Sequence, residues 1–290
     1  MTDVLSAPST TSNPVLAAAR VIQNRNIGDR YWQLVLEAPT VAERSKPGQF
    51  VMLSATRPGE LDPVLPRPMA LYDWDSTSGH VEIIYGVVGR GTHHLSTFHP
   101  GEELRTMGPV GQGFDLGPAA GTRLLVVGRG IGTCSLMAAA ADAALQGAHV
   151  TTVESAREPR SLFAAEKYAS KGISDVHTVT DAEGTSDPDQ LAQTLRGHLA
   201  HHPPTLILTC GSSRLASLCM QLADEWNARL QVSVEAHMAC GLGYCHGCSS
   251  GRRSSGLEGP LVCHDGPVFE YDPTTHGYTT MGTHTRTPQQ

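Results

Sequence analysis

Four of the seven cysteines lie close together near the end of the chain, with little side-chain bulk between them. The stretch "CGLGYCHGC" holds Cys240, Cys245 and Cys248, and Cys263 follows in "LVCHDG", which gives the spacing C-x4-C-x2-C-x14-C. Seven is an odd number for a disulfide framework, and thiols stay reduced in the cytoplasm. We expect a cytoplasmic chain without a secretory signal, and the pattern predicts a metal centre.

The order of the spacings favours iron and sulfur over zinc. A C-x4-C-x2-C run is typical of the plant-type [2Fe–2S] loop. Gly241, Gly243 and Gly247 leave the backbone nearly bare, so it can wrap an inorganic core. A zinc ribbon usually has two C-x2-C knuckles, and only one is present, although zinc stays open as the alternative. The predicted cluster ligands are Cys240, Cys245, Cys248 and Cys263.

Composition excludes two classes of partner. The net charge is −7 and no basic run occurs, which argues against a nucleic-acid partner held through its phosphates. No stretch approaches the roughly twenty apolar residues that a membrane-spanning helix requires. We therefore expect neither a nucleic-acid partner nor a membrane span.

The rhythm of the sequence changes near residue 121. Before it, short β-branched and aromatic runs such as "RYWQLVLEAP" alternate with Gly/Pro turns, which predicts a small antiparallel β-barrel. After it, strands alternate with helices, which predicts a Rossmann-like parallel sheet covered on both faces. The expected organisation is a barrel over 17–120, an α/β domain over 121–236 and a loop-rich cluster segment over 237–272 after the last strand, with disordered tails at 1–16 and 273–290.

Glycines follow one predicted strand and open a helix. In "VVGRGIGTCS", Gly128, Gly130 and Gly132 form either a phosphate-binding turn or an ordinary tight βα turn. "TLILTCGSS" ends a later strand at the same sheet edge, so Cys210 and Gly211 either border a nicotinamide or are simply buried.

The residues after another strand bear on coenzyme choice. Glu154 could accept a hydrogen bond from a ribose hydroxyl, which favours NADH, whereas Arg157 could meet a 2′-phosphate. We expect NADH, with NADPH possible.

The predicted barrel has its own candidate contacts. In "PRPMALYDWD", Arg67 could neutralise a flavin pyrophosphate beside Pro68. Tyr72 in the same stretch, or Tyr85 in "VEIIYGVV", could offer a ring face to an isoalloxazine or adenine. In "GRGTHHL", Gly91 and Thr92 could contact a phosphate. A surface arginine in a turn is the ordinary alternative.

The order of these motifs along the chain resembles that of the ferredoxin–NADP reductase superfamily. The closing "EAHMACGLGYCHGCSS" and "LVCHDGPVF" resemble the electron-transfer subunits of class 1B dihydroorotate dehydrogenases, over about 21–269. The resemblance implies that NADH reduces FAD, which reduces a [2Fe–2S] cluster held by the four cysteines. It implies FAD contacts at Arg67, Pro68, Met69, Ala70, Ile84, Tyr85, Gly86, Gly91 and Thr92.

The resemblance implies that the final electron acceptor is a catalytic subunit that contains FMN or another flavin. It also implies that the two kinds of subunit form a heterotetramer. No residue is suited to deprotonating dihydroorotate, so substrate chemistry would belong to that partner. Ala70, Cys134, Ser135 and His237 depart from the family pattern, which leaves open a reductase for an oxygenase, demethylase or other flavoenzyme. A zinc-stabilised nucleotide-binding protein is the third interpretation. We expect Leu242, Tyr244 and Val262 to form an apolar subunit contact.

Overall fold

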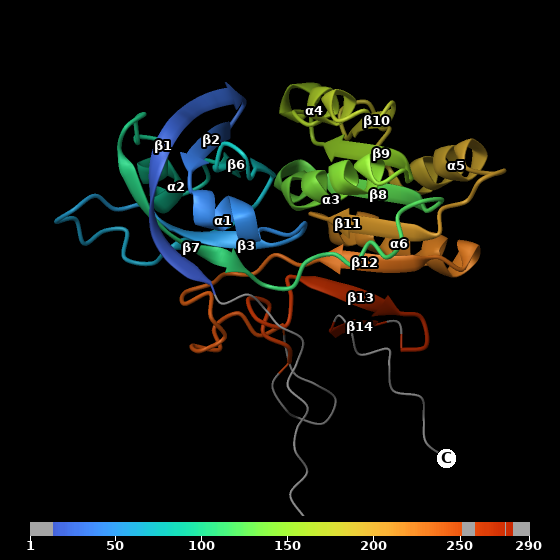
Figure 1. The fold of residues 1–290 in the computed structure, drawn as a ribbon. Helices are drawn as coiled ribbons and strands as arrows, with labels where there is room; N and C mark the ends of the chain where they lie inside the picture. Colours follow the sequence, from blue (N-terminus) through green and yellow to red (C-terminus); the bar gives the residue numbers. More distant parts are fainter. Residues whose placement is uncertain (1–13, 251–258, 276, 281–290) are drawn as a thin grey trace, which may run out of the picture.

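Two seven-stranded sheets organise the chain. The computed structural model describes residues 14–250, 259–275 and 277–280. One sheet comes from the first part of the chain and the other from the second, and the two lie side by side (Figure 1). We call them the barrel sheet and the mixed sheet. Among the described residues, no helix is long and apolar enough to span a bilayer.

The barrel sheet is antiparallel throughout, with strand order β4-β3-β7-β1-β2-β6-β5. Side chains alternate between the two faces of a strand, and apolar residues at every second position of β2, such as Leu34 and Leu36, enter the core. The sheet curls, so β4 near one end contacts β6 near the other. Its strands are β1 Val15–Gly28, β2 Tyr31–Glu37, β3 Phe50–Ser54, β4 Arg67–Ala70, β5 Asp73–Asp75, β6 His80–Gly86 and β7 Glu103–Val110. Its helices are α1 Pro39–Arg44 and α2 Arg90–Leu95.

The mixed sheet has the order β10-β9-β8-β11-β12-β13-β14 and is parallel from β10 to β12. Alternate residues of β8 serve opposite faces: Leu124 and Val126 pack with α3, whereas Leu125 and Val127 pack with α6. The predicted doubly covered parallel sheet is confirmed. Its strands are β8 Arg123–Arg129, β9 His149–Ala156, β10 Asp175–Thr180, β11 Leu206–Cys210, β12 Arg229–Ser233, β13 Val268–Asp272 and β14 Gly277–Thr280. Its helices are α3 Thr133–Leu145, α4 Ala165–Ser170, α5 Pro188–His198 and α6 Ser213–Trp226, with short 3-10 turns η1 Gly130–Gly132 and η2 Pro159–Ser161.

The cysteines lie between two neighbouring strands, and the expectation of an appendix after the last strand is wrong. We call residues 235–267 the cysteine segment. The chain leaves the mixed sheet after β12 and returns as β13, where Ser233 pairs with Val268. β13 was expected to belong to the cluster segment, but its alternating "VFEYD" pairs with β12 and so extends the mixed sheet.

Parts of both predicted tails belong to strands of the two sheets. Val15 and Leu16 begin β1, where they pair with Gly108 and Met107 of β7. Gly277–Thr280 forms β14, which pairs with β13 as a hairpin. In each case a neighbouring strand supplies hydrogen-bond partners that local composition does not reveal. Residues 1–13, 276 and 281–290 of the predicted tails lie outside the described residues.

Candidate functional site

A cavity of about 530 Å³ opens between the two sheets. The barrel sheet supplies one wall, and the turns after β8, β11 and β12 supply the other. Ten of the predicted cofactor residues line it: Arg67, Pro68, Met69, Ala70, Ile84, Tyr85, Gly86, Thr92, Gly132 and Cys210. The predicted Gly91, Gly128, Gly130 and Gly211 are not among the lining residues. A space of this size and mixed polarity suits an organic cofactor.

Arg67 lies at the barrel wall of the cavity. It begins β4, which pairs only with β3 in the sheet, so Pro68 costs no ladder hydrogen bond on the free side. The guanidinium donates to the carbonyl of Leu65 and occupies the space where a side chain at Gly91 would lie. Gly91 therefore admits Arg67, and the pair could hold an anionic group at this wall.

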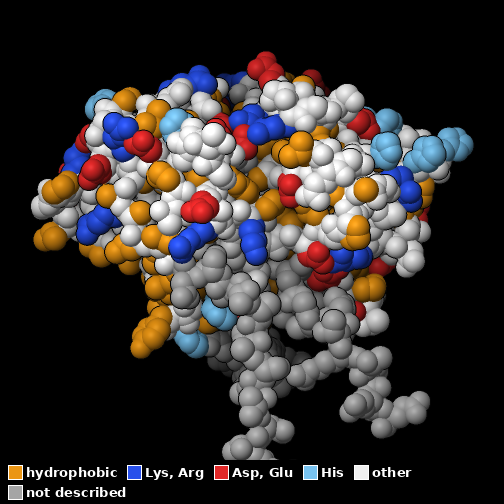
Figure 2. Space-filling view, viewed as in Figure 1, with side chains coloured by type: hydrophobic (Ala, Val, Ile, Leu, Met, Phe, Trp, Pro, Cys, Tyr) orange, Lys and Arg blue, Asp and Glu red, His pale blue; other side chains and the backbone are white. Residues whose placement is uncertain are grey.

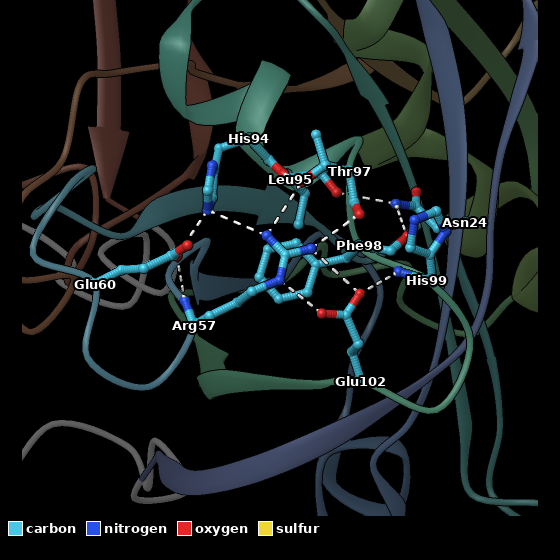
Figure 3. Close-up of polar contacts among 9 residues, drawn as sticks. All are labelled: Asn24, Arg57, Glu60, His94, Leu95, Thr97, Phe98, His99 and Glu102. Atoms are coloured by element: carbon cyan, nitrogen blue, oxygen red, sulfur yellow. Dashed lines mark hydrogen bonds and ion pairs between the residues drawn. The ribbon is translucent and has the colours of Figure 1, made fainter.

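Helix α2, which carries Gly91 and Thr92, is fixed by a network of ion pairs and hydrogen bonds (Figure 3). His94 Nε2 lies 2.8 Å from Glu60 Oε2. Arg57 Nε donates to Glu102 Oε1 at 2.6 Å, and its guanidinium lies 4.2 Å from the centre of the Phe98 ring. The hydrogen bond from Arg57 holds the pKa of Glu102 below its usual range. The network ties the 57–60 loop to the helix.

The hydroxyl of Thr92 is already engaged in the turn before α2. Its Oγ1 accepts from the N–H groups of Val88 at 3.0 Å and Gly89 at 3.2 Å, and it donates to the carbonyl of Gly89 at 3.0 Å. The hydroxyl therefore holds the turn before α2 together.

The glycines of the mixed sheet allow two turns to touch. A Cβ on Gly132 would lie 2.5 Å from Gly211 Cα, and Gly211 has a φ of +98°. Their close approach brings the turns after β8 and β11 together beside the cavity, since these strands are neighbours. An ordinary tight βα turn was one of the two alternatives for these glycines, and it is one of their roles. Of Gly128, Gly130 and Gly132, only Gly132 also lines the cavity.

Cys210 faces a carboxylate that sequence reasoning missed. Its Sγ lies 4.0 Å from Glu235 Oε1, and both residues line the cavity. Burial, followed by the neighbouring Glu235 charge, raises the pKa of Cys210 to about 12, so the thiol stays protonated at neutral pH. Burial also raises the pKa of Glu235. Glu235 follows β12, the neighbour of β11, and this shared sheet edge is the signal that could have placed it here.

One predicted ligand contact is wrong, and the structure separates two alternatives for another. Glu154 is buried and accepts the N–H groups of Phe163, Ala164 and Ala165 at 2.7, 2.9 and 3.0 Å, so its carboxylate holds the start of α4 and is not free for a ribose. Tyr72 and Tyr85 were the alternatives for a ring face at a cofactor; both are buried, and Tyr85 lines the cavity whereas Tyr72 does not. Arg157 is exposed just beyond β9.

The four cluster cysteines form two linked pairs. The backbone N–H of Cys245 donates to Cys240 Sγ at 3.4 Å, and the backbone N–H of Cys263 donates to Cys248 Sγ at 3.4 Å. Burial, helped by Cys248 and by the charge of Cys240, raises the pKa of Cys263 to about 12. Such mutual repulsion between thiolates is relieved when cations bind them.

Backbone N–H groups point at the same sulfurs. Gly243 donates to Cys263 Sγ at 3.0 Å, and Leu242 and Cys245 each donate to Cys240 Sγ at 3.4 Å. Burial opposes ionisation of Cys240, but the N–H groups of Leu242 and Cys245, together with the Cys245 side chain, outweigh it and lower the pKa of Cys240 to about 7. Gly241 and Gly243 have φ of +69° and +74°, which lets the loop curl around its sulfurs. Paired thiols with N–H groups aimed at sulfur fit a two-iron cluster well.

The cysteine segment packs against the barrel sheet. Buried Cys248, Cys263 and Val262 form one apolar cluster with Phe50 and Met52 of β3. At the other side Leu242 and Tyr244 are 49% and 90% exposed. Val262 was predicted to share that exposed patch and does not, because it faces the barrel. Figure 2 shows hydrophobic and histidine side chains at the lower edge, where Figure 1 places this segment.

The site begins at the cavity and ends at the surface. Met238 lines the cavity, Cys240 follows two residues later, and Cys245 is exposed. A cluster held here would therefore lie between a cofactor cavity and solvent.

Comparisons with known proteins agree with this geometry. Residues 235–274 match the family described as the iron-sulfur cluster binding domain of dihydroorotate dehydrogenase B. A relative from Listeria innocua serovar 6a, named dihydroorotate dehydrogenase B (NAD(+)), electron transfer subunit, is 31% identical over 255 residues, which cover 87% of this chain and 96% of the relative. A relative of the same name from Bacillus caldolyticus is 32% identical over 251 residues, covering 86% and 94%.

Solved structures share the fold. An NADH-dependent reduced ferredoxin–NADP oxidoreductase, described in connection with flavin-based electron bifurcation, superposes with a TM-score of 0.71 at 23% identity, covering 88% of each chain. A ferredoxin NADP+ reductase from Neisseria gonorrhoeae with bound FAD and NADP superposes with a TM-score of 0.56 at 15% identity, covering 73% of this chain and 91% of that one.

Proposed function

The chain belongs to the family of dihydroorotate dehydrogenase B electron transfer subunits, and from this premise we propose that it carries electrons from NADH through FAD and a [2Fe–2S] cluster to a flavin-containing catalytic subunit. The observation that carries the proposal is the position of the four cysteines between the cavity, which Met238 lines, and the surface, where Cys245 is exposed. When bound, FAD takes up two electrons as a hydride and passes them on singly, which a cluster requires.

The barrel wall would hold the flavin. Arg67 would neutralise the pyrophosphate, the backbone around Gly91 would approach it, and Met69, Ala70, Ile84, Tyr85 and Gly86 would border the rest. Apolar residues of this wall exclude water, which strengthens the interaction of a phosphate with a guanidinium.

The opposite wall would hold the nicotinamide. Gly132 and Cys210 meet there at the ends of neighbouring strands, and the small glycine leaves room for a ring. A protonated Cys210 adds no charge, so it would not oppose the transfer of a hydride.

The cysteine segment would hold the cluster and meet the partner. Cys240, Cys245, Cys248 and Cys263 would ligate the two irons, with Cys240/Cys245 and Cys248/Cys263 as the pairs. Leu242 and Tyr244 would contact the catalytic subunit. The complex would be a heterotetramer with two copies of each subunit. Reduced thiols in such number favour a cytoplasmic location.

An anaerobic absorption spectrum before and after NADH tests the proposal. We expect flavin bands over a broad reddish-brown absorption, both bleached by NADH. The variant Cys248→Ser should lose the cluster absorption and keep the flavin bands and the reduction of an artificial two-electron acceptor. Cys219→Ser is the matched control, because Cys219 is a buried cysteine among the apolar residues of α6, and it should keep both cofactors.

Two outcomes would contradict the proposal. A colourless protein that contains zinc in the cysteine segment would remove the electron path. A coloured protein that NADH does not bleach would leave the cofactors in place but reject NADH as the donor.

A further inference from the structure

Two histidines and an aspartate meet at the outer edge of the mixed sheet, in a region that electron transfer does not use. Asp175 and His177 are two residues apart on β10, so their side chains leave the same face of the strand. β10 is the terminal strand of the sheet. Val179, on the same face, packs with Leu191 and Leu195 of α5. The helix therefore crosses this face and brings His198, in its last turn, to the same place.

The ligand atoms converge. His177 Nε2 lies 3.0 Å from Asp175 Oδ1, and His198 Nε2 lies 2.9 Å from Asp175 Oδ2. One ligand atom from each residue lies within 4.8 Å of the other two. The imidazole rings meet edge to face, with 4.7 Å between their centres. Both Nε2 atoms thus face the oxygens of one carboxylate.

A neighbouring strand orients the carboxylate. Thr151 is paired with Asp175 in the β9–β10 ladder, and its hydroxyl donates to Asp175 Oδ2 at 2.7 Å. Ligating carboxylates in metalloproteins are commonly held by such an outer hydrogen bond. This bond fixes the direction of the remaining lone pairs of Asp175.

The group borders a second cavity, of about 450 Å³. Asp175 and His198 line it together with two further histidines, His149 and His202. The three converging side chains are 29–41% exposed, so an ion could enter from solvent and keep open positions for water.

We propose that Asp175, His177 and His198 bind one divalent transition-metal ion, of the class that zinc represents, at a site distinct from the cysteine segment. Two imidazoles and one carboxylate form a donor set found in zinc sites, whereas magnesium and calcium prefer oxygen ligands throughout. Three protein ligands leave a fourth position for water. The alternative is an ion pair between Asp175 and two protonated imidazoles, which binds no metal.

Zinc binding to the full, cluster-loaded chain separates the two. The protein is dialysed against micromolar zinc buffered by a weak chelator, and zinc and iron per chain are measured together by mass spectrometry. We expect one zinc with the iron unchanged, and an affinity at least tenfold lower in His198→Ala and in His177→Ala. His198 lies at a helix end, so its variant should fold; His80→Ala, a histidine of the barrel sheet, is the matched control and should bind as the parent does.

Three results would overturn the proposal. The parent chain could take up no zinc, or both variants could take up zinc as the parent does. Zinc uptake accompanied by loss of iron would assign the ion to the cysteines. None of these results depends on whether NADH reduces the protein, so this site and the proposed electron path can fail separately.

Discussion

The cysteine segment and the mixed sheet both contact the barrel sheet through buried apolar residues, and the second contact adds ion pairs. The cysteine segment joins it through buried apolar residues, among them Cys248, Val262 and Met52. The mixed sheet joins it through a second buried apolar cluster, which includes Tyr31 and Ile84 of the barrel and Tyr168 of α4. It also joins it through a polar contact, in which Lys167 Nζ of α4 lies 2.8 Å from Asp73 and 2.7 Å from Glu82. A hydrogen bond of 2.8 Å from Ser161 to Asp29 adds to this second contact.

The difference bears on what each contact must do. Apolar packing excludes water and tolerates little change in spacing. A cluster on the cysteine segment would therefore stay at one distance from a flavin in the barrel. Ion pairs of partly exposed side chains can exchange their partners for water at small cost. The ion pairs on the coenzyme side of the cavity can thus exchange with water, while the apolar cluster around Tyr31 and Tyr168 keeps the two sheets together.

The largest expected effect comes from Gly241→Ala, which tests the apolar contact. Its φ is +69°, and a Cβ would lie 2.5 Å from Met52 Cγ, inside the buried cluster. Backbone strain and the displaced methionine should together cost about 2–3 kcal/mol of unfolding free energy. Thermal unfolding and the cluster absorbance per chain would measure this loss.

Gly147→Ala is the matched control for that variant. Gly147 has a φ of +88° but nothing within 4 Å of the added Cβ, so only the backbone cost of about 1 kcal/mol remains. Equal losses in the two variants would show that the close approach to the barrel contributes nothing.

Lys167→Met tests the polar contact and should have the next largest effect. The change leaves Glu82 without this cation and leaves Asp73 with Lys171 alone, which lies 2.7 Å away. We expect a loss of about 1–2 kcal/mol, between the values for exposed and buried pairs, because the site is only partly buried. Urea unfolding would measure it. Lys171→Met removes one contact and should cost less, so the opposite order would contradict our account.

Acid should weaken the polar contact and spare the apolar one. Burial alone would raise the pKa of Asp73, but Lys167 and Lys171 outweigh it and hold this pKa below 3.8. The ionised carboxylate therefore stabilises the fold above that pH, and its contribution disappears as the pH falls through the folded-state pKa. We expect Asp73→Asn to be about 1 kcal/mol less stable than the parent from pH 5 to 7, with the gap closing below pH ~4. A gap independent of pH would remove the charge from the explanation.

Ser161→Ala should have the smallest effect. The change deletes the hydrogen bond from Ser161 to Asp29, which connects the two halves of the molecule. We expect the free energy of unfolding to fall by about 0.5–1 kcal/mol, the net contribution of one hydrogen bond. Ser170→Ala removes a hydroxyl that bonds only to the carbonyl of Lys167 in its own helix, and it should change thermal stability less. Equal shifts in melting temperature would show that the hydrogen bond between Ser161 and Asp29 adds nothing to the stability of the contact between the two sheets.

Local patterns predicted what local chemistry controls. The x4 and x2 cysteine spacings predicted the loop because its glycines and sulfurs act within a few residues of one another. The βα turn with Gly132 followed from a strand, a glycine run and a helix in succession. Glu154 failed as a ribose contact because its carboxylate bonds to backbone N–H groups nine to eleven residues ahead, which no local pattern reveals.

By itself, then, the sequence determined the two kinds of sheet and the cysteine loop, because periodicity and spacing are properties of neighbouring residues. The individual FAD and NADH contacts stay predictions. Only the tertiary structure decided that the cysteine segment leaves from β12 and returns as β13, that it packs on the barrel, and that Glu235 meets Cys210. It also decided which side of the segment faces solvent and that His198 joins Asp175 and His177. These outcomes depend on contacts between distant segments, whose partners are selected by packing once the sheets have formed.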